Sequence, residues 1–119
     1  MFSPRILIID ESDESREILR TLLERRGLTT LEAPRPEQAV ELANRHRPDL
    51  IVFDADSDQT ADLEATADLG SAASQNHTPI VVLGTVRKYR ERLSTGQFVA
   101  KPYHYGPLLS RIEELLAAS

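Results

Sequence analysis

Four short apolar runs, none longer than four residues, constrain the fold of this 119-residue chain more than any other feature. They lie at residues 6–9, 50–53, 80–83 and 98–100. Successive side chains of a strand point to opposite faces of a sheet. A run without polar residues therefore predicts a strand buried on both faces, as in a parallel sheet. Residues 28–33 are more polar, which better fits an edge strand of the same sheet.

Helical patterns lie between these runs. They cover residues 18–23, 39–43, 61–73 and 108–116, and residues 87–93 form at most a short helix. Ser12 or Asp13 is a candidate N-cap for the first helix and Gly27 a stop signal, while Pro36 suits the first turn of the second helix. Strand and helix thus alternate five times. This predicts an α/β fold, an open doubly wound five-stranded parallel sheet with helices on both faces.

The composition excludes several classes of protein. Nineteen acidic residues against 14 basic ones give a net charge of -5, which argues against nucleic acid or an anionic membrane as the main partner. The chain has no cysteine, which excludes disulfide scaffolds, thiolate zinc sites and cysteine nucleophiles. No apolar run approaches the length of a membrane span, and the first residues do not read as a signal peptide. We expect one cytoplasmic domain over residues 1–119.

Charged residues follow the predicted strands at the edge where doubly wound sheets bind ligands. Asp10 and Glu11 follow the first strand, Asp54 and Asp56 the third, and Lys101 the fifth. Carboxylates packed together raise one another's pKa, and a Mg²⁺ ion with oxygen ligands would relieve that repulsion. The lysine could then hold a phosphoryl oxygen, and one carboxylate could act as nucleophile to form an acyl phosphate. Acid pairs at strand ends also occur for purely structural reasons. The hypothesis of a Mg²⁺ and phosphoryl site therefore rests on the acids and the lysine occurring together.

Three of these segments resemble a known family, the response-regulator receiver domains of two-component signalling. Residues 5–11 (RILIIDE) resemble its opening strand, 48–54 (PDLIVFD) its phosphoacceptor strand and 98–103 (FVAKPY) its last strand. The resemblance extends over nearly the whole chain. It implies a flavodoxin-like sheet with strand order 2-1-3-4-5 and phosphorylation by a histidine kinase or phosphotransfer protein.

The resemblance also implies a role for each residue that matches a motif. Asp54 resembles the aspartate that accepts the phosphoryl group, and Lys101 the lysine that contacts that group, with a cis bond after it. Asp10 and Glu11 resemble the acidic pair that holds Mg²⁺, with Glu11 where a second aspartate is more usual. Asp56 resembles the position whose backbone carbonyl completes the metal shell.

The fourth strand departs from the family pattern. Gly84 stands where the family usually carries threonine or serine, and Thr85 comes one residue late. A one-residue offset turns a strand side chain to the other face, unless a bulge at the glycine restores the register. In the family that hydroxyl moves toward the phosphoryl group and an aromatic residue, here Phe98, fills the space. The switch is therefore expected to be weakly coupled.

Two further departures concern the loops. Residues 57–62 lack the proline and glycine that the family commonly places after the phosphoacceptor. The stretch from Gly84 to Lys101 is short for the family, which predicts a truncated fourth helix. In the family, that segment with the fifth strand and last helix forms the surface for a downstream partner or a second copy.

Three functions remain open at this point. The first is a phosphoryl-accepting receiver, which is not an enzyme beyond Mg²⁺-dependent self-phosphorylation and dephosphorylation. The second is a degenerate receiver that binds a protein partner without phosphate. The third is a small phosphatase, because Asp54-Ala55-Asp56 mimics the nucleophile and acid of haloacid-dehalogenase-type enzymes, although that motif belongs on a first strand.

Overall fold

Strands and helices alternate along this computed structural model, which describes residues 3–55, 63–84 and 97–118. The elements are β1 (Arg5–Ile9), α1 (Asp13–Arg25), β2 (Thr29–Ala33), α2 (Pro36–His46), β3 (Leu50–Asp54), α3 (Leu63–Gln75), β4 (Ile80–Gly84), β5 (Gln97–Ala100) and α4 (Tyr105–Ala118). The expectations for Asp56, Thr85 and the segment 87–93 lie outside the described residues.

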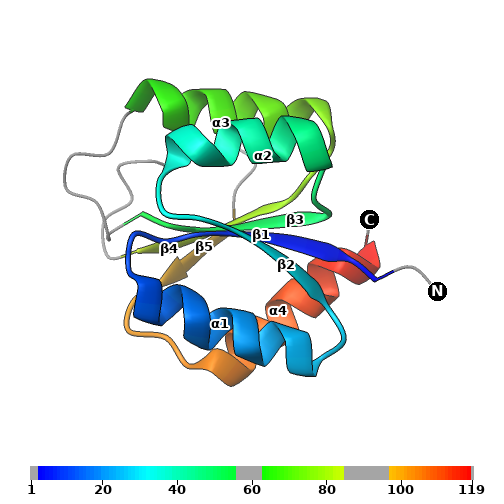
Figure 1. Cartoon of the computed structure of the whole chain (residues 1–119). Helices are drawn as coiled ribbons and strands as arrows, with labels where there is room; N and C mark the ends of the chain where they lie inside the picture. Colours follow the sequence, from blue (N-terminus) through cyan, green and yellow to red (C-terminus); the bar gives the residue numbers. More distant parts are fainter. Residues whose placement is uncertain (1–2, 56–62, 85–96, 119) are drawn as a thin grey trace.

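The five strands form one parallel sheet in the order β2-β1-β3-β4-β5. This confirms the predicted doubly wound α/β fold and its strand order. The helices cover both faces of the sheet, with α2 and α3 on one side and α1 and α4 on the other (Figure 1). The point at which the strand order reverses lies between β1 and β3, so the carboxyl ends of these two strands mark the expected ligand edge.

Two hydrophobic clusters, one on each face of the sheet, hold these layers together. In β1, Leu7 and Ile9 face the α2–α3 layer, whereas Ile6 and Ile8 face the α1–α4 layer. The α2–α3 cluster also includes Ala39, Ala43, Ile51, Phe53, Leu69 and Val82, and the α1–α4 cluster Leu19, Leu23, Val52, Leu83, Leu108 and Ile112. Burying each large aliphatic side chain stabilises the fold by about 1.5–3 kcal/mol. Consecutive residues of a central strand enter the two clusters in turn, so every residue of such a strand is apolar.

The ends of the first two helices follow the predicted signals. Ser12 is the N-cap of α1, and its hydroxyl accepts a hydrogen bond from the Ser15 backbone N–H at 3.2 Å. After α1, Gly27 takes a φ of 82°, a left-handed conformation that glycine adopts without a steric penalty. Pro36 occupies the first turn of α2, where its missing N–H has no helical partner to lose.

The prediction that residues 98–100 form a strand buried on both faces is wrong. β5 lies at the edge of the sheet next to β4, and its residues are partly buried or exposed. An apolar run reports the character of its side chains but not the position of the strand in the sheet. β2 lies at the opposite edge, as its polar sequence predicted.

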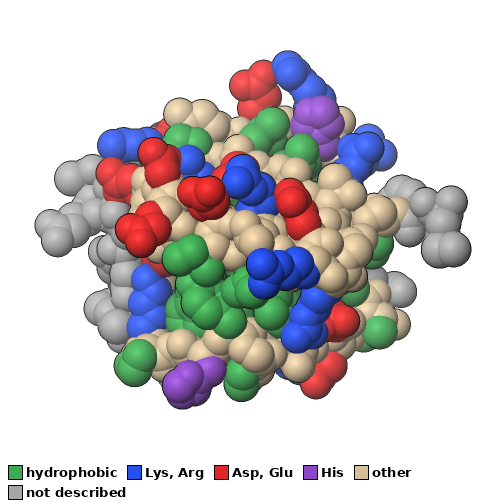
Figure 2. Space-filling model, turned by 60° about the horizontal axis from the view of Figure 1, so that its bottom comes forward, with side chains coloured by type: hydrophobic (Ala, Val, Ile, Leu, Met, Phe, Trp, Pro, Cys, Tyr) green, Lys and Arg blue, Asp and Glu red, His purple; other side chains and the backbone are tan. Residues whose placement is uncertain are grey.

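The outer face of the α1–α4 layer is uneven in polarity. Figure 2 shows hydrophobic side chains gathered near the middle of this face, with acidic and basic side chains around them. Ile18 on α1 is the exposed large hydrophobic residue of the described part of the chain, at 41% exposure. No helix in the described ranges has the length and apolar content needed to cross a bilayer.

Candidate functional site

The carboxyl edge of the sheet brings together three of the predicted site residues. Asp54 is the last residue of β3, Asp10 directly follows β1, and Lys101 directly follows β5. The backbone holds these strand ends in place, because Asp10 N–H donates to the Ala33 carbonyl at 3.1 Å and Lys101 N–H to the Gly84 carbonyl at 3.3 Å. Residues far apart in the sequence therefore meet through strand pairing.

The Lys101 ammonium group pairs with the Asp54 carboxylate. Its Nζ lies 2.8 Å from both Oδ1 and Oδ2 of Asp54. The Asp54 side chain is only 8% exposed, while that of Lys101 is 26% exposed. The Lys101–Pro102 peptide bond is cis, as the sequence motif implied. A nearly buried carboxylate is thus held beside one compact cation that contacts both of its oxygens.

Asp10 is the acid of the site whose ionised form is disfavoured. It is 7% exposed, and its Oδ1 accepts a hydrogen bond from the Ser12 backbone N–H at 2.9 Å. The pKa of Asp10 is raised from 3.8 to about 6, mainly by burial and also by the neighbouring Asp54 carboxylate. The Ser12 hydrogen bond and the Lys101 charge lower this pKa but do not offset the burial. The predicted repulsion between strand-end acids is therefore present and falls on Asp10.

The third predicted acid, Glu11, pairs with an arginine outside the Asp10–Asp54–Lys101 group. The Glu11 Oε1 lies 3.7 Å from a terminal guanidinium nitrogen of Arg35, which directly precedes α2. Both side chains are partly exposed, at 39% for Glu11 and 46% for Arg35. Among the residues that the structure describes, no three acidic or histidine side chains are grouped closely enough to hold a metal ion. Asp56, the further predicted ligand, is outside those residues.

Two arginines lie near the site in addition to Lys101. The Arg16 guanidinium donates a hydrogen bond to the Asp10 backbone carbonyl at 2.6 Å, and its side chain is only 15% exposed. Arg35 is the second cation that sequence reasoning missed. It follows the carboxyl end of β2, so the strand-end rule could have found it if applied to this edge strand too.

The donor set fits a hard divalent cation in part. Asp10 and Asp54 offer only oxygen atoms, which Mg²⁺ prefers. Burial, together with the Asp54 charge, raises the pKa of Asp10, so a bound cation would stabilise its ionised form. The Glu11 carboxylate belongs to the adjacent residue, but it contacts Arg35 and would have to leave this cation to join the pair. No histidine lies among these groups, in keeping with an oxygen-ligand site.

Tyr103 follows the cis proline and lies near the site, since its phenol interacts with Asp54 and Asp10. Its ring packs edge-to-face on Tyr105, with centroids 5.6 Å apart and planes at 86°. Burial, together with the nearby Tyr105, raises the pKa of the Tyr103 phenol well above its usual range, so this hydroxyl stays neutral. It adds no negative charge to the carboxylates.

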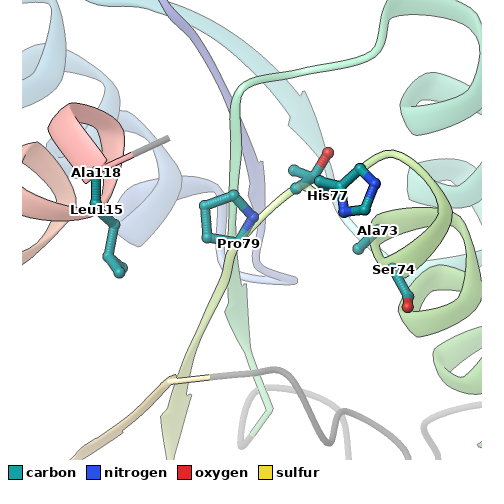
Figure 3. Close-up of a pocket in the computed structure, with 7 residues that line it drawn as sticks. Ala73, Ser74, His77, Pro79, Leu115 and Ala118 are labelled. Carbon is teal, nitrogen blue, oxygen red and sulfur yellow. The ribbon is translucent and has the colours of Figure 1, made fainter.

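A cavity of about 450 Å³ lies away from this site. Ala73, Ser74, His77, Thr78, Pro79, Leu115 and Ala118 line it. Figure 3 shows these side chains between the carboxyl-terminal ends of α3 and α4, beside the start of β4. None of them is an acid or a lysine, so the cavity lacks the groups that phosphoryl chemistry needs. The charged edge remains the candidate site.

Comparison with known proteins identifies the family. The sequence profile of the response regulator receiver domain matches residues 6–113, most of the chain. The chain belongs to this family. Receiver domains are the signalling phosphoacceptors of two-component systems rather than classical enzymes.

Individual relatives agree with this assignment. The polar-differentiation response regulator DivK of Brucella anthropi is 25% identical over 116 residues, covering 93% of this chain and 94% of the relative. The signal receiver domain of a histidine kinase from Syntrophus aciditrophicus has a TM-score of 0.80 at 26% identity, covering 98% and 92% of the two chains. A CheY-like receiver domain protein from Methanospirillum hungatei reaches a TM-score of 0.83 at 18% identity, covering 98% and 96%, and shows the fold alone.

Proposed function

We propose that Asp54 is the phosphoacceptor of this receiver domain. The observation that carries the proposal is the Asp54–Lys101 contact, in which one ammonium group lies 2.8 Å from both oxygens of a nearly buried carboxylate. Asp10 lies close enough to this pair to interact with both charges. Family membership supplies the chemistry, because receiver domains accept phosphoryl groups from histidine kinases or phosphotransfer proteins.

The transfer follows from the positions of these groups. One Asp54 oxygen attacks the phosphorus of a phosphohistidine or a small phosphodonor, and the bond from phosphorus to the donor breaks as the acyl phosphate forms. The leaving group departs with the electron pair of that bond. Lys101 then turns from the carboxylate to a phosphoryl oxygen and balances part of its charge. Its 26% exposure leaves the ammonium room for this small movement.

Mg²⁺ is part of this proposal, with Asp10, Glu11 and Asp54 as side-chain ligands and the Asp56 backbone carbonyl as a further one. When bound, the ion would neutralise charge on the phosphoryl oxygens. The chain's own contribution is to hold Asp10 rigidly, through the Ser12 N–H and the Arg16 contact to its backbone carbonyl.

Mass spectrometry after incubation with acetyl phosphate and MgCl₂ tests the phosphoacceptor. We expect one added phosphoryl group that alkaline treatment removes, and none in Asp54→Asn. Asp68→Asn is the matched control, because Asp68 is an exposed aspartate on α3. An unmodified wild-type mass, under conditions that label an ordinary receiver, would contradict this proposal and favour a degenerate receiver that binds its partner without phosphate.

The atypical switch is a second part of the proposal. Gly84 is the last residue of β4 and pairs with Ala100 of β5, in the same register as the preceding residues of these two strands. This pairing argues for Gly84 at the position of the usual hydroxyl. Thr85 lies outside the described residues, so its proposed role stays a prediction. Without the hydroxyl, a phosphoryl group on Asp54 has one hydrogen bond fewer with which to drive a rearrangement.

For the partner surface we propose the side of the molecule formed by β5 and α4. The Arg111 guanidinium on α4 donates a hydrogen bond to the Gln97 side chain on β5 at 2.8 Å, so the two elements present one continuous polar surface. The segment 87–93 would complete this surface, and a second copy of the chain is the alternative occupant. A cytoplasmic location and the absence of nucleic-acid binding stay predictions of the sequence.

A further inference from the structure

We propose that Arg35 is a built-in competitor for Mg²⁺, which lowers the affinity of the metal site by holding the Glu11 carboxylate. This inference rests on the proposed metal site and adds a positioning residue to it. The observation behind it is that Glu11, next to the buried Asp10 in the chain, contacts an arginine from a different strand–helix connection.

The arrangement of charges gives the first argument. In the described part of the chain each acid of the edge has a cation close by: Lys101 at Asp54, Arg35 at Glu11, and Arg16 at the Asp10 carbonyl. A divalent cation that enters this edge therefore does not meet three unbalanced carboxylates. It has to displace at least the Lys101 and Arg35 contacts, and each displacement lowers the apparent affinity.

The length of the Glu11 side chain gives the second argument. An aspartate at this position, which is more usual in the family, has one methylene group fewer between its backbone and its carboxylate. Glu11 reaches an arginine on the neighbouring β2–α2 connection, with 3.7 Å between the charged atoms. Glutamate at residue 11 and arginine at residue 35 therefore act as a pair.

Arg35 can be replaced without removing a capping hydrogen bond from α2, which makes the idea testable. Arg35 is the N-cap residue of α2, but its side chain makes no capping hydrogen bond, and it is 46% exposed. Replacing it by glutamine removes the charge and keeps most of the side-chain length. We expect little change in the stability of α2, so a change in Mg²⁺ affinity would not come from a change in folding.

The test is an NMR titration of the full chain with MgCl₂, following the backbone amides of Asp10 and Ser12 at low ionic strength. We expect Arg35→Gln to bind Mg²⁺ about three- to tenfold more tightly than the wild type, since the Glu11 carboxylate is no longer held by a cation. Arg35→Lys keeps the positive charge, so its Mg²⁺ affinity should lie between those of the wild type and Arg35→Gln. Raising the ionic strength should shrink the difference, because the Glu11–Arg35 pair is partly exposed to solvent.

Arg45→Gln is the matched control. It also removes one arginine charge, but Arg45 pairs with Glu41 at the far end of α2, with 2.8 Å between the charged atoms. Its effect on Mg²⁺ affinity should be less than twofold. In a Glu11→Gln background, the gain from Arg35→Gln should fall to the same level, since the carboxylate under competition is gone.

The outcomes separate this inference from the proposed function. Equal Mg²⁺ affinities for Arg35→Gln and Arg45→Gln, or weaker binding by Arg35→Gln, would overturn the role of Arg35 and leave the metal site standing. No Mg²⁺-dependent shift in the wild type or in any variant would overturn the metal site and this inference together.

Discussion

Asp10 is the residue of the site whose ionisation lowers the stability of the folded protein. It is buried, it adjoins the Asp54 carboxylate, and its pKa is raised to about 6. A carboxyl group with a folded-state pKa above its unfolded value binds protons more tightly in the folded protein. Asp10 therefore costs no stability at low pH. The penalty grows as the pH rises from about 4 to about 6 and is complete above that range.

We predict that Asp10→Asn stabilises the metal-free protein at pH 7 by about 1–3 kcal/mol, since each relieved pKa unit corresponds to about 1.4 kcal/mol. Asparagine keeps the oxygen that accepts the Ser12 N–H. Urea unfolding with EDTA, followed by circular dichroism at pH 7 and pH 4, measures the effect. The gain should be much smaller at pH 4, where the Asp10 carboxyl group is already protonated in the folded protein.

Asp68→Asn is the control for this measurement, because Asp68 is exposed on α3 and should change little at either pH. Asp54→Asn is less informative. It also relieves the repulsion on Asp10, but it takes the charged partner from Lys101. A stabilisation by Asp10→Asn that persists undiminished at pH 4 would show that its cause is not the charge.

At the scale of elements, an ionic network joins α1 to the edge strand β2. Glu32 on β2 lies 3.4 Å from the Arg16 guanidinium and 3.2 Å from that of Arg20, both on α1. Glu32 is 30% exposed and Arg16 15%, so the network is partly shielded from water. Because Arg16 also contacts the Asp10 carbonyl, the network fixes the first turn of α1 against the candidate site.

We predict that Glu32→Gln destabilises the protein by about 1 kcal/mol, since it removes the partly shielded carboxylate that the Arg16 and Arg20 guanidinium groups share. Glu41→Gln on α2 is the comparison, because Glu41 pairs with Arg45 on the open surface and should cost less than about 0.5 kcal/mol. Chemical unfolding at low and high salt measures both. Equal costs for the two variants would contradict a special role for the network.

Much of this arrangement of elements follows from the sequence alone. The apolar runs predict β1, β3 and β4 because these strands are buried on both faces, and the polar residues 28–33 predict the edge strand β2. β5 differs, since burial depends on where a strand lies in the sheet and its sequence does not report that. The strand-end rule brings Asp10, Asp54 and Lys101 together correctly. It cannot predict that Glu11 contacts Arg35, because side-chain direction is set by tertiary neighbours.

At the scale of the whole molecule, the question is how far a change at Asp54 can spread. Gly84 lies at the end of β4, between β3 and the β5 strand that carries Phe98. A missing hydrogen bond to a phosphoryl group is worth about 1.5–3 kcal/mol if charge-assisted. Moving a two-state switch from 1:99 to 99:1 takes about 5.5 kcal/mol, so this one contact is a large share of the driving force.

We predict that the beryllofluoride adduct of the wild type gives NMR shifts near Asp10 and Asp54 that fade before Phe98. Gly84→Thr should extend the shifts to Phe98, because it returns a hydroxyl group to the end of β4. Gly84→Ala is the control that adds a side chain without a hydroxyl group. Large shifts at Phe98 in the wild-type adduct would contradict weak coupling and point to Thr85 as the hydroxyl donor.

The edge position of β5 has a consequence for the lifetime of the site. Lys101 follows a partly buried strand of four residues that pairs with β4, whereas Asp54 ends a strand buried along its whole length. Hydrogen exchange of backbone amides is fastest where burial is least, so the amides of β5 should exchange with deuterium before those of β3. Each such opening separates the ammonium group from Asp54 while the rest of the sheet stays intact. We therefore expect fraying of this single strand to uncover the acid intermittently.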